Sequence, residues 1–144
     1  MRNLLLSLCI GLLMLGLQDG LSQTIVSTTP ENKNVVLEEF TGIHCGYCPD
    51  GHLLAQQFHD ANPGDVILVN IHTGSYATPS AGEPDFRADP LGSTIAGQSS
   101  LTGYPAGTIN RHVFPGVGQS GGTAMSRGSW ASSGGQMFAQ PSCV

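Results

Sequence analysis

Cys45 and Cys48 are separated by Gly46 and Tyr47, so they form a Cys-x-x-Cys pair. A cysteine thiolate is the nucleophile in disulfide exchange, and a second thiol nearby can attack the resulting mixed disulfide and release the product. We expect Cys45 to be the exposed attacking thiol and Cys48 the shielded resolving thiol. In the oxidised state the two would form a disulfide with each other.

The sequence around the pair predicts a β-α-β unit that would position it. Residues 35–40 and 66–71 are apolar and β-branched, as in buried strands, and the second run is apolar on both faces, as in parallel sheets. Between them, residues 49–62 carry apolar side chains at helical spacing, and the helix breakers at 62–65 end this segment. The unpaired N–H groups at a helix start favour the thiolate form of a cysteine placed there, here Cys45.

Two other roles compete with thiol exchange: an inert structural disulfide, and a zinc site completed by His44 or His52. A disulfide across one helical turn closes a very short loop, so it stabilises the fold little. Zinc needs four ligands, often as two separated pairs, and Cys143 is a lone and distant cysteine. Haem attachment is excluded because Pro49, rather than a histidine, follows Cys48. We therefore favour thiol exchange with no metal and no cofactor.

Histidines flank the pair. His44 could stabilise the Cys45 thiolate when it is protonated, although an ordinary exposed loop histidine explains it as well. We expect His52 and His59 to be surface residues of the helix. His72 ends the second strand and is expected to cap the edge of the sheet rather than face the cysteines.

The rest of the chain predicts a single domain with a further strand and two helices. Residues 72–90 are rich in Gly, Pro, Ser and Ala and predict a long loop, either functional or a plain surface insertion. The later elements are a helix at 91–101, a turn at 103–105, a strand at 106–114 and a helix at 126–140. The net charge of −5 argues against a nucleic-acid partner.

The first residues are typical of a signal peptide. Arg2 precedes an almost wholly apolar run at 4–17, which is short for a membrane span, and Ser22 suits signal peptidase cleavage. We predict a signal peptide at 1–22, with an uncleaved anchor as the alternative. The mature domain, 23–144, would work in an oxidising compartment, and we expect it to be truncated at its C-terminal end.

Several segments resemble the secreted thioredoxin-like proteins of the outer membrane protein 28 family: residues 37–42, 45–49, 85–87 and 103–111. The order of strand, Cys-x-x-Cys, helix, strand and a later proline also resembles thioredoxin. The resemblance implies an α/β, thioredoxin-like fold with a central mixed β-sheet flanked by helices. It also implies export to the periplasm, the outer membrane or the extracellular space.

The resemblance further implies a substrate-binding role for Tyr104 and Pro105, joined by a cis peptide bond and facing the cysteine pair. The backbone there would pair with an extended substrate strand. Two departures from thioredoxin affect the redox potential, because residues around the thiolate tune it: His44 stands in place of a tryptophan, and Gly46-Tyr47 in place of Gly-Pro.

Glu39 is a third candidate catalytic residue. Strand alternation puts Glu39 on the face of Val35 and Leu37, and Glu38 on the face of Phe40, so the two glutamates must differ in environment. By resemblance, Glu39 falls where thioredoxin keeps a buried carboxylate beneath its second cysteine. Burial without a cationic partner would raise its pKa and suit it to take a proton from that cysteine. The alternative is a half-exposed, solvated carboxylate at a strand edge.

The sequence therefore predicts an exported thiol–disulfide oxidoreductase. Its partners would be protein thiol or disulfide substrates and a separate redox partner, with possible peripheral association with the outer membrane. The alternative is a non-enzymatic module that binds or supports other components at the outer membrane or cell surface.

Overall fold

The computed structural model describes residues 31–142. Within them the chain has an α/β fold with a four-stranded mixed sheet in the order β2-β1-β3-β4 and three α-helices. The strands are β1 (Val35–Thr41), β2 (Val66–His72), β3 (Ala106–Ile109) and β4 (Met125–Ser126), and the helices are α2 (Cys48–Ala61), α3 (Leu91–Gln98) and α4 (Trp130–Phe138). β1 pairs with β2 in parallel and with β3 antiparallel, and β4 is antiparallel to β3. The predicted α/β class with a mixed sheet is confirmed.

Some sequence predictions lie outside the described residues, namely the signal peptide at 1–22 and the lone Cys143. No helix within residues 31–142 is both long enough and apolar enough to cross a bilayer.

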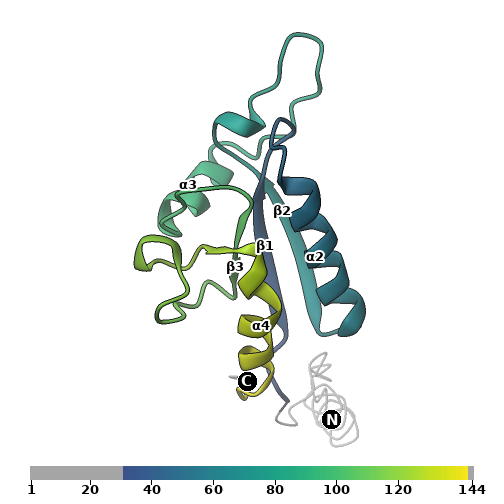
Figure 1. The fold of residues 1–144 in the computed structure, drawn as a ribbon, viewed down its shortest axis with the longest axis vertical. Helices are drawn as coiled ribbons and strands as arrows, with labels where there is room; N and C mark the ends of the chain where they lie inside the picture. Colours follow the sequence, from purple (N-terminus) through teal and green to yellow (C-terminus); the bar gives the residue numbers. More distant parts are fainter. Residues whose placement is uncertain (1–30, 143–144) are drawn as a thin grey trace, which may run out of the picture.

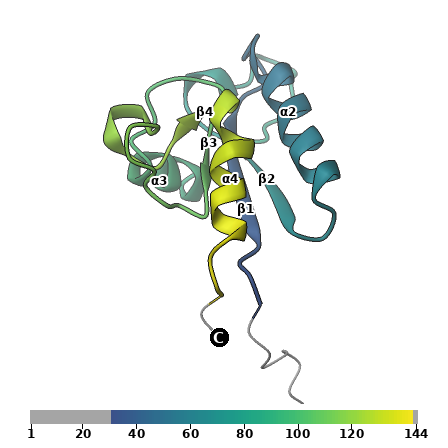
Figure 2. The same cartoon turned by 60° about the horizontal axis from the view of Figure 1, so that its bottom comes forward.

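Helices cover both faces of the sheet (Figures 1 and 2). Val35 and Leu37 of β1 pack in the core beneath α2 and α4, whereas Phe40 packs in a second cluster with residues of α3. This is the alternation predicted for the first strand. It places Glu39, which shares the face of Val35 and Leu37, on the side covered by α2 and α4.

The predicted β-α-β unit is confirmed. Pro49 lies in the first turn of α2, and Asn62 caps its end by donating from Nδ2 to the carbonyl oxygen of Phe58 over 2.8 Å. The expectation that the second strand is buried holds for Val66 and Ile71 but not for the whole strand, because β2 is an edge strand of the described sheet. Its Ile67 and Val69 are 51% and 39% exposed.

Two later elements are shorter than predicted. The strand expected at 106–114 ends at Ile109, because Asn110 and Arg111 both take a positive φ of 49° and turn the chain. The Asn110 side chain continues the pairing with β1 beyond the end of β3, since its Oδ1 accepts a hydrogen bond from the Val36 N–H over 2.6 Å.

The terminal helix, expected at 126–140, is confined to Trp130–Phe138, and residue 126 belongs to β4. Gly134 lets this helix approach α2 closely, because a Cβ at this position would lie 2.2 Å from Cζ of Phe58. The helix predicted at 91–101 forms but ends at Gln98.

Candidate functional site

Cys45 and Cys48 form a disulfide at the junction of β1 and α2, with 2.14 Å between the sulfur atoms and 5.4 Å between the Cα atoms. The chain turns after β1, where the Cys45 N–H donates to the carbonyl oxygen of Gly42 over 3.0 Å. Cys48 then begins α2. The predicted pairing of the two cysteines is confirmed, and Cys45 precedes the helix as expected.

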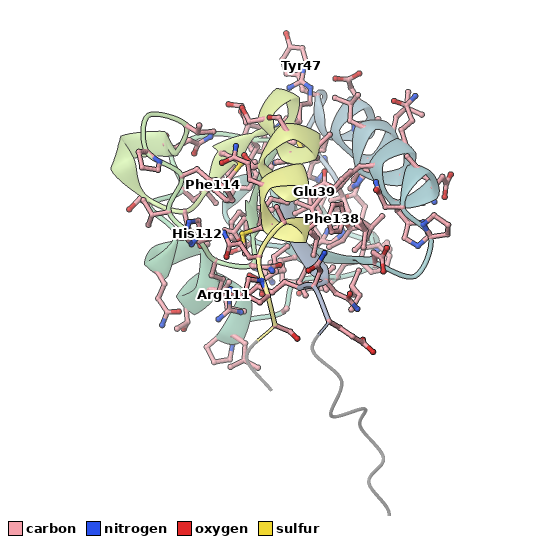
Figure 3. The ribbon with its side chains drawn as sticks, turned by 90° about the horizontal axis from the view of Figure 1, so that it is seen from below. Glu39, Tyr47, Arg111, His112, Phe114 and Phe138 are labelled. Carbon is pink, nitrogen blue, oxygen red and sulfur yellow. A yellow bond between two sulfur atoms is a disulfide. The ribbon has the colours of Figure 1, made fainter. Side chains whose placement is uncertain are left out.

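The two cysteines differ in accessibility. Cys45 is 7% exposed and Cys48 is 1% exposed, so the predicted ranking holds in the disulfide form. The predicted exposure concerns the reduced Cys45 thiol, whereas here its sulfur is bonded to Cys48, so it stays a prediction. Between them Tyr47 is 71% exposed and projects away from the body of the molecule (Figure 3).

Glu39 lies in the interior beside α2 and is 1% exposed (Figure 3). Its Oε1 has no hydrogen-bond partner among the described residues. A Cβ at Gly51 would lie 2.8 Å from Oε1 and 3.0 Å from Cβ of Pro105. Gly51 is one turn after Cys48 on the buried face of α2, so the carboxyl and Pro105 both lie against the first turn of the helix that Cys48 begins.

Burial raises the pKa of Glu39, and this effect outweighs the charge and hydrogen bond of His52, which lower it. The predicted burial and the direction of the pKa shift are confirmed. Glu39 does have an ionisable partner, whose ring is a cation only when protonated. His52 Nδ1 lies 2.9 Å from Glu39 Oε2.

His52 is the residue of this site that sequence reasoning missed. Its Nε2 lies 3.3 Å from Oγ1 of Thr41, and its side chain is 40% exposed, so the ring spans from the buried carboxyl to solvent. The expectation of a plain surface residue holds only for His59, whose Nδ1 lies 3.0 Å from Oδ1 of the neighbouring Asp60. The spacing carried a signal, because residues four apart lie on one side of a helix and His52 follows Cys48 by four.

Glu38 lies on the opposite face of β1 in a contrasting environment. Arg111 donates from Nη2 to Oε1 over 2.5 Å and from Nε to Oε2 over 2.7 Å, and Thr108 donates to Oε2 over 3.0 Å. The hydrogen bonds from Arg111 lower the pKa of Glu38 despite its burial. The two adjacent glutamates therefore differ as predicted, one held as a carboxylate and one shifted toward the neutral acid.

The Tyr104–Pro105 peptide bond is cis, as predicted. Pro105 meets the first turn of α2 through the contact at Gly51 described above. The Tyr104 side chain contacts the loop after β2: its hydroxyl donates to the carbonyl oxygen of Thr73 over 3.0 Å, and its ring packs edge-on against Tyr76 with 5.5 Å between centroids.

The loop that follows β2 projects from the end of the sheet at which α2 begins (Figure 1). It is attached beside the cysteine pair, because the His44 N–H donates to the carbonyl oxygen of Tyr76 over 3.0 Å and His44 Nε2 lies 2.9 Å from Glu83 Oε2. Both side chains of this ion pair are about two-fifths exposed, so it contributes little stability. His44 thus holds the loop rather than pointing freely into solvent.

A cation also borders the start of α2. Arg127 donates from Nε to Oδ2 of Asp50, and its Cζ lies 6.0 Å from the centroid of the Tyr47 ring. At this distance a guanidinium is weakly attracted to the face of an aromatic ring. The contact links the segment before α4 to Tyr47, one of the two residues between the cysteines.

Within the described part of the chain, no group of three or more His, Cys, Asp or Glu side chains is placed to hold a metal ion. No protein-family model matches the sequence, and none of the curated proteins searched matches it. A function for this chain therefore has to rest on the geometry of the site itself.

Proposed function

We propose that this protein is an exported thiol–disulfide oxidoreductase with a thioredoxin-like domain, and that Cys45 and Cys48 are its redox pair. The observation that carries the proposal is the disulfide at the β1–α2 junction, together with a buried carboxyl of raised pKa that lies against the first turn of α2. The parallel β1-α2-β2 unit and the antiparallel β3 that begins after Pro105 support a thioredoxin-like arrangement.

In the reductive direction, the Cys45 thiolate attacks one sulfur of a substrate disulfide. A mixed disulfide forms and the first substrate thiolate leaves. Cys48 then attacks the Cys45 sulfur, which closes the Cys45–Cys48 bond and releases the second substrate thiolate. Two electrons pass from the cysteine pair to the substrate, and a separate redox partner returns them. The oxidative direction is the reverse of these steps.

Glu39 is the base that takes the proton from Cys48 in the second step. Its Oε1 is buried without a hydrogen-bond partner among the described residues and faces the first turn of α2, where it is free to accept a proton. Burial raises the pKa of this carboxyl, which brings it closer to the range useful for general-base work.

Pro105 and Tyr104 form the substrate-binding side of the site. Pro105 borders the same helical turn as Glu39, and the backbone beside it would pair with an extended segment of a substrate protein. Export to an oxidising compartment, the periplasm, outer membrane or cell exterior, fits the use of a disulfide. The partners would be protein thiols or disulfides, with peripheral association with the outer membrane as a further proposal.

One observation favours a second candidate, a non-enzymatic binding or structural module at the outer membrane or cell surface. Cys45 is only 7% exposed in the disulfide form, and a sulfur must be reached by its partner for exchange to occur. In this alternative the disulfide would be inert.

Insulin reduction by dithiothreitol distinguishes the two. The protein without its signal peptide should accelerate insulin precipitation, and the Cys45→Ser variant should not. The non-enzymatic alternative is favoured if the parent protein and Cys45→Ser both leave the rate at that of dithiothreitol alone.

A further inference from the structure

His52 joins the buried carboxyl of Glu39 to solvent. Its Nδ1 lies 2.9 Å from Glu39 Oε2, while the carboxyl is 1% and the ring 40% exposed. The other carboxyl oxygen, Oε1, is buried without a partner in the described structure and faces the first turn of α2. The two oxygens of one carboxyl thus face two directions, one toward the helix that Cys48 begins and one toward a solvated imidazole.

A buried carboxylate needs such a connection if it is to act as a base. Taking a proton inside the protein changes the charge of the site, and an uncompensated charge in a poorly solvated place is costly. Histidine is the side chain that exchanges protons readily near neutral pH. An ion pair of Glu39 and protonated His52 carries no net charge, and neither does the same pair after both groups have become neutral.

We propose that His52 is the positioning residue through which Glu39 exchanges its proton with solvent during the second step of the redox reaction. The inference rests on the thiol-exchange function proposed above. The step starts from the Glu39 carboxylate and protonated His52. Glu39 takes the proton of Cys48 on Oε1 and His52 releases the proton on its Nε2 to water, which leaves both groups neutral. The Cys48 thiolate attacks the Cys45 sulfur of the mixed disulfide, the substrate thiolate leaves, and one proton in total passes to solvent.

The surroundings of His52 fit this role. From β1 it faces the Glu39 carboxyl and Thr41, whose Oγ1 lies 3.3 Å from Nε2. On β2, His72 pairs with Thr41 across the two strands and is close enough for its charge to interact with that of His52. Burial, and then the charge of His52, lower the pKa of His72, so a second positive charge next to His52 is disfavoured.

The test follows the two steps separately in the reduced protein with 5,5′-dithiobis(2-nitrobenzoate). The attack by Cys45 releases the first coloured thiolate, and the attack by Cys48 releases the second. We expect His52→Ala to slow the second release at least about tenfold, since loss of a general base typically costs a hundredfold or more. The first release should stay within about twofold of the parent rate, because His52 acts only through Glu39 in the second step. Added imidazole should restore the second release, an effect that a purely structural role would not produce.

Two further variants sharpen the result. His52→Gln keeps a hydrogen-bond donor for Glu39 but cannot exchange a proton. Its second release should therefore also be slow, and it should lack the pH dependence near neutrality that we expect of the parent. His59→Ala is the matched control, because His59 lies on the same helix and its ring pairs with Asp60. It should release both thiolates as the parent does.

The outcomes distinguish a failure of the thiol-exchange function from a failure of the role of His52. A parent protein that gives no second release overturns the thiol-exchange function itself. If the parent gives both releases and His52→Ala matches it from mildly acidic to mildly alkaline pH, the role of His52 is refuted. The same conclusion follows if His52→Gln behaves as the parent, because a hydrogen bond alone would then suffice.

Discussion

Gly51→Ala tests whether α2, Glu39 and Pro105 meet as described. The added methyl would lie 2.8 Å from Glu39 Oε1 and 3.0 Å from both Cβ and Cγ of Pro105. These neighbours cannot easily move away, because His52 holds the other carboxyl oxygen and the proline ring is rigid. The carboxyl, the ring or the helix must therefore shift to make room.

The expected magnitude follows from two opposing terms. Alanine in place of glycine inside a helix gains about 1 kcal/mol. Overpacking a tight site typically costs about 1–3 kcal/mol. Gly51→Ala should therefore lower the free energy of unfolding by up to about 2 kcal/mol.

Gly135→Ala provides the matched control. Gly135 lies inside α4, and a Cβ there would have no neighbour within 4 Å. It should therefore gain the helix term alone and raise the free energy of unfolding by about 1 kcal/mol. Because that term is common to both variants, the difference between them, about 1–3 kcal/mol, isolates the crowding at Gly51.

Urea unfolding of the oxidised protein measures both variants, with the single and buried Trp130 as the fluorescent probe. Gly51→Ala should unfold at lower urea than the parent, and Gly135→Ala at higher urea. An equal stabilisation of both variants would refute the contact between the first turn of α2, Glu39 and Pro105, and with it the proposed position of the base.

Other predictions concern the same site. In the reduced protein at mildly acidic pH, iodoacetamide should modify Cys45 before Cys48; equal labelling, or Cys48 first, would reverse their roles. Glu39→Gln should slow release of the mixed disulfide and leave the first attack nearly unchanged, whereas Glu38→Gln should do little to either step. The free energy of unfolding should fall as the pH drops below 4.5, the ordinary pKa of a glutamate, because the lowered pKa of Glu38 stabilises the fold only while Glu38 is ionised. It should also fall as the pH rises above 4.5, because the raised pKa of Glu39 stabilises the fold only while Glu39 is protonated. Urea unfolding at a series of pH values checks both effects. Glu38→Gln should reduce the loss of stability below pH 4.5, and Glu39→Gln should reduce the loss above it. Variants whose stability depends on pH as the parent's does would contradict the environments described for the two glutamates.

The sequence predicts well those features that local pattern determines. Alternation along β1 was enough to separate Glu38 from Glu39, because side chains of a strand point to opposite faces by geometry alone. Helix breakers at 62–65 defined the end of α2, because the residues at a helix end stop the helix by their own backbone preferences. The cysteine pair could be placed between the two elements without knowing how the rest of the chain packs.

What the sequence could not give depends on packing between distant segments. The apolar residues of β2 predicted burial, but their exposure depends on how many strands and helices cover them. The partner of Glu39 was missed because the four-residue spacing places His52 on the same side of the helix as Cys48 but does not show which side chain of β1 its ring contacts. The early end of β3 depends on Asn110, a residue that takes left-handed backbone conformations more readily than most.

Trapping of a mixed disulfide tests the central claim most directly. Cys48→Ser should accumulate a stable disulfide between Cys45 and a thiol of a substrate protein, because no second thiol in the pair remains to release it. Intact mass and peptide mapping after incubation with a disulfide-containing protein would place the adduct on Cys45, and Cys45→Ser should form none. The absence of any adduct on Cys45, under conditions in which the parent has been reduced, would contradict a thiol-exchange function for this pair.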